Sequence, residues 1–155
     1  MKTIIIYVTK YGSAGEVAQK IAGKINGALV HDLKQGDVPS LADYDCIIFG
    51  CSVYASNIRK EAKAFIFKNE NILKEKKLGI FLLGLDKKGK KKYLEANFPQ
   101  VLLQTAKATG FFGGVFDPKK AGVMVRLLMR IITKTPNYIS TIDNDKIDKF
   151  IEAIK

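Results

Sequence analysis

The first residues that could do chemistry follow directly after an apolar run, in the stretch TKYGSAGE over residues 9–16. Ser13 and Glu16 have the spacing of a capping box, in which a hydroxyl and a carboxylate bind exposed amides at a helix start. That arrangement leaves Thr9 and Gly12 without a role. Hydroxyls and backbone N–H groups at the positive end of a helix can instead bind a phosphate, and this would involve all four residues.

The same stretch excludes two common nucleotide-binding loops. It has neither the glycine and lysine pattern of ATP-binding loops nor the three-glycine pattern of dinucleotide-binding loops. The sequence therefore favours a phosphate monoester that is bound without a lysine or a magnesium ion.

Two further loops offer groups for a planar ligand. The stretch GCSVYASN, residues 50–57, surrounds the ring of Tyr54 with small polar residues. It fits a loop in which Asn57 caps the next helix, and it also fits a platform on which a planar ring stacks. The stretch GLDKKG, residues 84–89, is either an ordinary turn or a segment that wraps the far edge of the same ring.

Short apolar runs that alternate with amphipathic segments must position these loops. Apolar runs, typical of strands buried on both faces, predict strands over residues 3–8, 28–33, 46–50, 78–84 and 108–116. Helical periodicity predicts a first helix with Val17, Ile21 and Ile25, then helices over 58–68, 88–107 with a break at Pro99, 121–133 and 143–154. This alternation predicts one α/β domain over residues 1–155, with a parallel sheet covered on both faces and ligands at the carboxyl ends of its strands.

Composition narrows the class of protein. Hydrophobic residues make up 47% of the 155, which fits a folded domain, and no apolar run approaches the roughly 20 residues of a membrane-spanning helix. Cys46 and Cys51 would point to opposite faces of one strand and cannot bridge each other. They form no metal-binding pattern with His31, so we expect no metal site.

The net charge bears on partners. The chain has 26 Lys and Arg against 15 Asp and Glu, a formal charge of +11. Nucleic acid, an anionic membrane surface and a phosphate-bearing ligand are all compatible with this excess. The lysine runs lack the interleaved aromatic residues of single-strand readers, so no nucleic-acid partner is expected.

The loops after the first, third and fourth strands resemble the FMN site of flavodoxins, and the resemblance covers essentially the whole chain. It implies a flavodoxin-like three-layer sandwich with a five-stranded parallel sheet of order 2-1-3-4-5. It also implies that FMN is bound with its phosphate in the first loop and its isoalloxazine ring between the other two. The residues so implied are Thr9, Lys10, Tyr11, Gly12, Ser13 and Ala14 for the phosphate; Ser52, Val53, Tyr54 and Ala55 on one side of the ring; and Leu85, Asp86 and Lys87 on the other. Ala14 departs from the family pattern, which usually has a hydroxyl residue there.

Two features differ from the soluble electron-carrying flavodoxins. Those carriers are typically acidic, whereas this chain is basic. Residues 114–136 also resemble the late segment of the flavodoxin-like, menaquinone-dependent protoporphyrinogen oxidases of the HemG type, which lie at the membrane face. This resemblance implies an FMN-dependent oxidoreductase that oxidises protoporphyrinogen with a quinone acceptor. The alternative is an FMN electron-transfer protein that has no substrate of its own and serves a redox partner.

Apolar residues cover most of the predicted helix over residues 121–133, and Arg126 and Arg130 form a narrow polar edge. Either this helix is buried on most sides against the sheet, or it offers one face to lipid or a partner, with its basic edge at anionic headgroups. We expect a cytoplasmic protein. The second alternative adds peripheral contact of residues 119–134 with the inner face of the membrane.

Lysines after the fourth strand, Lys87, Lys88 and Lys90, bear on the redox potential. A unit charge about 8 Å from the flavin, at an effective dielectric constant near 20, contributes roughly 2 kcal/mol. Because a cation favours the reduced, anionic flavin, the sequence predicts a potential less negative than that of an acidic flavodoxin.

Overall fold

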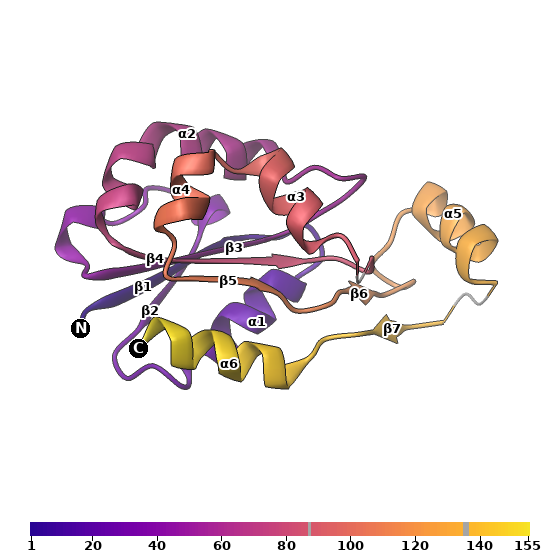
Figure 1. The fold of residues 1–155 in the computed structure, drawn as a ribbon. Helices are drawn as coiled ribbons and strands as arrows, with labels where there is room; N and C mark the ends of the chain where they lie inside the picture. The colour runs from indigo at the N-terminus through magenta and orange to yellow at the C-terminus, as the bar shows by residue number, and fades with distance from the viewer. Residues whose placement is uncertain (87, 135–136) are drawn as a thin grey trace.

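The structure, a computed structural model, describes residues 1–86, 88–134 and 137–155. Five parallel strands form its central sheet in the order β2-β1-β3-β4-β5. Their bounds are β1 Thr3–Val8, β2 Leu29–Asp32, β3 Cys46–Ser52, β4 Lys77–Leu83 and β5 Ala108–Phe111. The predicted α/β class and strand order are therefore confirmed (Figure 1).

Helices cover both faces of the sheet (Figure 1). Those on one face are α1 (Ser13–Ala22) and α6 (Asn144–Ile154), and those on the other are α2 (Lys60–Glu75), α3 (Lys90–Asn97) and α4 (Gln100–Thr105). Cys46 packs in the apolar cluster under α1 and α6, and Cys51 packs in the cluster under α2. The two free thiols thus lie on opposite faces of β3, as their spacing predicted.

The predicted helix over residues 88–107 breaks at Pro99, which separates α3 from α4. By contrast, α2 runs past the predicted end at residue 68 to Glu75, and this extension buries Leu73 against the sheet. Short 3₁₀ turns lie at Leu33–Gln35 and Leu41–Asp43.

Between β5 and α6 the chain leaves the sheet. The predicted strand over residues 108–116 ends early, because Gly113 takes a left-handed conformation with φ of +89° and divides it into β5 and β6 (Val115–Phe116). β6 pairs with β7 (Ile139–Ser140) in an antiparallel ribbon. This ribbon and the residues beside it, 115–122 and 137–140, are here called the stalk, and the stalk carries α5 (Val123–Thr133) (Figure 1).

The helix α5 stands away from the body of the molecule (Figure 1). None of its residues is buried. Its large aliphatic side chains with exposures between 55% and 81% are Val123, Met124, Leu127, Leu128, Ile131 and Ile132. Of the two alternatives for this helix, burial on most sides against the sheet is therefore wrong. Within the described parts of the chain, no helix is long and apolar enough to cross a membrane.

The strand register brings the three predicted loops to one edge of the sheet. Val8 at the end of β1 pairs with Cys51, and Ser52 at the end of β3 pairs with Leu83 at the end of β4. The loops that follow these strands therefore begin side by side.

Candidate cofactor site

The loop between β1 and α1 is shaped by its own threonine. The backbone N–H of Gly12 donates to Thr9 Oγ1 at 2.9 Å, and Gly12 takes a left-handed conformation with φ of +102°. Thr9 is buried, and its backbone carbonyl oxygen accepts a hydrogen bond from Lys34 Nζ. In this structure Thr9 therefore holds the turn that aims α1 at the edge of the sheet.

The predicted capping box is wrong. Gly12, and not Ser13, is the N-cap of α1, and no side chain caps it. The first intrahelical bond runs from Glu16 N to Gly12 O at 3.0 Å, so the N–H groups of Ser13, Ala14 and Gly15 have no acceptor within the helix. These three donors and the positive end of the helix dipole face the edge where the loops meet.

Ser13 connects the first loop to the second. Its Oγ lies 3.4 Å from Ser52 Oγ, at the end of the neighbouring strand β3. Ala14, which replaces a hydroxyl residue of the family pattern, is fully buried in the core under α1. At this position the loop therefore offers only a backbone N–H, and the second hydroxyl comes from Ser52.

Two tyrosine rings stand beside these hydroxyls. The rings of Tyr11 and Tyr54 meet edge to face, with centroids 6.0 Å apart and planes at 79°. The Lys10 ammonium lies over the Tyr11 ring, 5.1 Å from its centroid. Burial raises the pKa of the Tyr54 phenol above its ordinary value, with a smaller opposing hydrogen bond from Ser52. The phenol is therefore neutral at pH 7, and 37% of Tyr54 is open to solvent as a platform for an aromatic ligand.

Beyond the platform, the second loop closes in a two-residue turn. Tyr54 and Asn57 exchange backbone hydrogen bonds of 2.9 Å in both directions, and Ala55 and Ser56 both have positive φ, 46° and 67°. Arg59 occupies the N-cap position of α2 and no side chain caps this helix, so the alternative in which Asn57 caps it is wrong. Asn57 instead donates from Nδ2 to the Ala55 carbonyl at 3.1 Å and stabilises the turn itself.

Asn97, at the end of α3, holds this turn from outside. Its Nδ2 donates to Ser56 O at 2.9 Å, and its Oδ1 accepts from Ile58 N at 3.0 Å. Sequence reasoning missed Asn97, because it lies 41 residues beyond Ser56 and no local pattern connects the two.

The third loop follows β4 and has its own anchors. Asp86 accepts from Tyr93 OH at 2.9 Å and from Lys88 N at 3.1 Å, and both hydrogen bonds hold the pKa of its carboxyl below the ordinary value. Leu85 is partly exposed beside it, and Val53 N donates to Leu83 O at 2.8 Å, which joins the second loop to β4. The predicted site residue Lys87 lies outside the described residues.

The charges at this loop bear on the potential predicted from the sequence, which stays a prediction. Lys90 Nζ donates to the Thr109 carbonyl at 2.9 Å, on the outer edge of β5, so its charge is directed at this strand. Asp86 adds a negative charge at the third loop itself, and this charge opposes the effect expected of the lysines.

The stalk adds a cation to the first loop that the sequence did not reveal. Lys120 Nζ donates to Tyr11 O at 3.4 Å and would lie 3.8 Å from a Cβ placed on Gly12. The lining of a small hollow of about 30 Å³ consists of Tyr11, Ser13, Glu16, Val115, Asp117, Lys120 and Tyr138. The sequence predicted a phosphate loop without a lysine, and here a lysine reaches this loop from 109 residues away.

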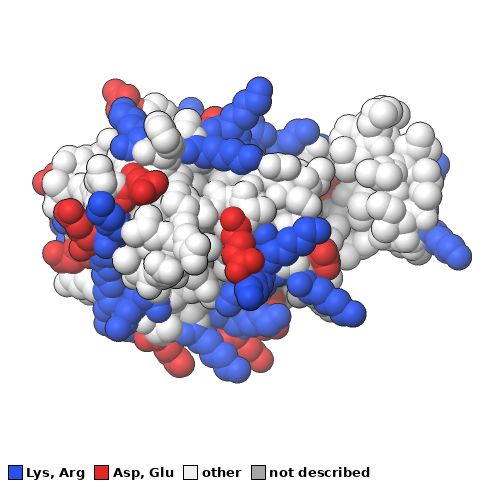
Figure 2. Space-filling view, turned by 45° about the horizontal axis from the view of Figure 1, so that its top comes forward, with Lys and Arg blue, Asp and Glu red and all other residues white. Residues whose placement is uncertain are grey.

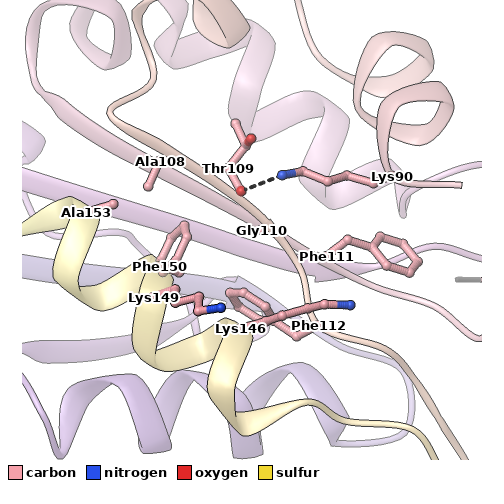
Figure 3. Close-up of a pocket in the computed structure, with 10 residues that line it drawn as sticks. All are labelled: Lys90, Ala108, Thr109, Gly110, Phe111, Phe112, Lys146, Lys149, Phe150 and Ala153. Atoms are coloured by element: carbon pink, nitrogen blue, oxygen red, sulfur yellow. Dashed lines mark hydrogen bonds between the residues drawn. The ribbon is translucent and has the colours of Figure 1, made fainter. Parts of the chain in front are cut away.

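A larger hollow of about 440 Å³ lies elsewhere, along the free edge of β5 (Figure 3). Its lining includes the rings of Phe111, Phe112 and Phe150 and the side chains of Lys90, Lys146 and Lys149. None of the described residues predicted for the cofactor site lines it. Lysines beside an edge strand commonly prevent that strand from pairing with another chain. Here Lys90 Nζ donates a hydrogen bond to the Thr109 carbonyl oxygen of the edge strand β5.

In the described ranges, no group of three or more His, Cys, Asp or Glu side chains could hold a metal ion. The donors at the first loop are the Ser13 and Ser52 hydroxyls, the backbone amides at the start of α1 and the Lys120 ammonium, which suit an anion, and the carboxylates of Glu16 and Asp86 lie farther along the same edge.

Comparisons with known proteins agree with the geometry. The family model of the flavodoxin domain matches residues 4–141. A search of curated protein sequences finds no match to the chain.

Several solved structures have the same fold. A short-chain flavodoxin associated with a non-canonical PDU bacterial microcompartment has a TM-score of 0.62 at 15% identity, over 99% of this chain and 97% of that one. A flavodoxin from Streptococcus pneumoniae has a TM-score of 0.57 at 13% identity, over 99% and 95%. A flavoprotein from Lactobacillus acidophilus, in complex with FMN, has a TM-score of 0.52 at 15% identity, over 73% and 91%. At these identities the likeness concerns the fold alone.

Proposed function

Because this chain belongs to the flavodoxin domain family, we propose that it binds FMN at the carboxyl edge of its sheet and transfers electrons through it. FMN supplies the redox chemistry when it is bound, and the protein supplies position and electrostatic field. The flavoprotein from Lactobacillus acidophilus with the same fold is itself a complex with FMN.

The observation that carries this proposal is the arrangement around Ser13. Three N–H groups at the start of α1 have no intrahelical acceptor, and the hydroxyls of Ser13 and Ser52 lie 3.4 Å apart beside them. Such a set of donors at a helix N-terminus fits a phosphate monoester. Lys120 brings a compensating charge to the same loop.

The adjoining groups fit the rest of the cofactor. Tyr54 offers a partly exposed ring at the end of β3, and the two-residue turn after it holds this ring in place. Leu85 and Asp86 follow β4, the next strand of the sheet, and would meet the far side of a flat ligand on Tyr54. Stacking on an aromatic ring favours a planar conjugated molecule over a simple sugar phosphate.

Titration with FMN and with riboflavin tests the proposal, because riboflavin lacks only the phosphate. Quenching of flavin fluorescence should give a much lower Kd for FMN than for riboflavin. Ser13→Ala and Ser52→Ala each remove a hydrogen bond to a charged group. Either variant should raise the Kd for FMN by roughly tenfold to a hundredfold, about 1.5–3 kcal/mol, and leave the Kd for riboflavin nearly unchanged. The exposed Ser40→Ala is the matched control. Equal affinity for the two flavins would contradict phosphate binding at this loop.

The physiological reaction has two candidates. An electron carrier without its own substrate needs only the site described above. Oxidation of protoporphyrinogen with a quinone acceptor is favoured by one specific observation, the exposed apolar helix α5, because quinones of this class dissolve in lipid. Turnover of protoporphyrinogen with menaquinone by the FMN-loaded protein would support the second candidate. Reduction by flavodoxin reductases without such turnover would support the first.

A further inference from the structure

The end of the molecule formed by α5 differs from the rest of its surface. In Figure 2 the body carries mixed basic and acidic side chains, while the protruding end is mostly uncharged, with cations only at its border. Six large aliphatic side chains of α5 are more than half exposed. Soluble monomers rarely leave a contiguous apolar surface of this kind uncovered, so a partner surface is expected there.

The sides of α5 are not equivalent. With 3.6 residues per turn, Met124, Leu128, Ile131 and Ile132 lie together on the side opposite Arg126 and Arg130. A groove of about 500 Å³ between α5 and the stalk is lined by Phe116, Pro118, Val123, Arg126, Leu127 and Arg130. The two guanidinium groups thus border a groove on the stalk side, and the other four aliphatic side chains lie on the opposite side of the helix.

Charge distinguishes between the partners that could cover this surface. Residues 118–134 contain five cations, Lys119, Lys120, Arg126, Arg130 and Lys134, and no Asp or Glu. A second copy of the chain docked through α5 would bring two such sets of cations together, which costs free energy. An anionic lipid surface can cover both the aliphatic side of α5 and its cations, because acyl chains accept aliphatic side chains and headgroup phosphates pair with arginine.

We propose that α5 is an interfacial helix that docks the protein on anionic membranes. Its aliphatic face enters the boundary between headgroups and acyl chains, and Arg126 and Arg130 bind headgroup phosphates from the stalk side. The stalk leaves the body beside the first loop, where Lys120 contacts Tyr11. Docking therefore places the carboxyl edge of the sheet close to the lipid surface.

Co-sedimentation of the full chain with lipid vesicles tests this proposal, and it needs no flavin. Vesicles of phosphatidylcholine alone are compared with an equimolar mixture of phosphatidylcholine and phosphatidylglycerol. The protein should sediment with the mixed vesicles and much less with the neutral ones. Leu128→Gln with Ile131→Gln should weaken this binding by about a hundredfold or more. Arg126→Gln with Arg130→Gln should weaken it by roughly tenfold to thirtyfold.

Matched controls come from the body. Phe67 is 85% exposed on α2, more than Leu128 or Ile131, so Phe67→Gln removes an exposed apolar side chain without touching α5. Lys68→Gln with Lys74→Gln removes two charges from the same helix α2. All of these variants should keep the thermal midpoint and circular dichroism of the wild type, and the controls should also keep wild-type vesicle binding.

Three results would overturn the proposal. One is the absence of binding to the mixed vesicles. Another is equal loss of binding in the α5 variants and in the α2 controls. The third is a dimer of the wild type in light scattering that Leu128→Gln with Ile131→Gln dissociates, with no vesicle binding, because the partner of α5 would then be a second copy of the chain.

Discussion

The helices α5 and α6 have the same length, eleven residues each, and both have one strongly apolar side. Their surroundings are opposite. α6 buries Ile147, Phe150, Ile151 and Ile154 against the sheet, and α5 buries none of its residues. An apolar side indicates that a helix packs against another surface. The segments that connect the helix to the fold determine whether that surface lies in the same molecule.

The connections explain the difference. α6 follows directly after Asp143, whose N–H donates to Phe112 O at 2.8 Å and whose carboxylate caps the helix, so α6 begins against the core. α5 instead lies between the two strands of the stalk and is held at a distance from the sheet.

The largest expected effect contrasts one side chain from each helix. Phe150 is 4% exposed and packs against Phe81 and Phe112, so Phe150→Ala should lower the free energy of unfolding by about 3–5 kcal/mol. Leu128→Ala should change it by less than about 0.5 kcal/mol, because Leu128 is mostly exposed. Denaturant unfolding measures both. A large loss in Leu128→Ala would mean that α5 packs on the body in solution.

Two glycines give the next largest contrast. Gly113 has a φ of +89°, and a Cβ there would lie 1.9 Å from Thr141 O. Gly113→Ala should therefore lower the free energy of unfolding by about 2 kcal/mol or more. Gly122, at the start of α5, has an ordinary φ of −66° and open space around it. Gly122→Ala should therefore be nearly neutral in the same thermal or denaturant unfolding. Equal effects would show that the junction of stalk and body is not rigid.

A buried thiol gives a pH-dependent contrast. Burial raises the pKa of the Cys51 thiol far above its ordinary value. Above pH 9 the unfolded chain loses this proton while the native state keeps it. The contribution of this thiol to the free energy of unfolding is therefore constant below pH 9. Above pH 9 it should fall by about 1.4 kcal/mol per pH unit.

Unfolding at a series of pH values compares the wild type with Cys51→Ala, because other groups also titrate in this range. The slope above pH 9 should be shallower in Cys51→Ala. A cysteine added on α5, Ile131→Cys, should leave the slope unchanged, since residue 131 is exposed. Identical slopes in the wild type and Cys51→Ala would contradict the burial of this thiol.

The smallest expected effect concerns the contact between stalk and first loop. Lys120→Gln should weaken FMN binding by roughly threefold to tenfold, because an exposed cation contributes only about 1 kcal/mol. Riboflavin binding should not change. Lys119→Gln, the neighbouring residue, is the control. If both variants behaved alike, the charge of Lys120 would act through the general field of the protein and not through this contact.

Most of the sheet was predictable from the sequence, because runs such as TIIIYV and CIIFG are apolar throughout and the sheet buries both of their faces. The first loop was also located correctly at the end of β1. Its details were not predicted. The Ser13 and Glu16 spacing suggested a capping box, yet Gly12 at positive φ is the N-cap and leaves the Ser13 hydroxyl near Ser52.

Other parts could not be predicted, for physical reasons. Asn97 and Lys120 reach the site through contacts that span 41 and 109 residues, and no local pattern encodes such distances. The exposure of α5 depends on the short pairing of β6 with β7, and each of these strands has only two residues. Strands of this length leave almost no periodicity in a sequence.

Hydrogen exchange with and without FMN tests the central claim most directly, because it reports both regions of the same molecule at once. FMN should slow exchange in residues 9–16 and 50–57, at the carboxyl edge of the sheet, and leave exchange in residues 123–133 of α5 unchanged. Protection that is absent from residues 9–16, or that appears only in α5, would contradict it.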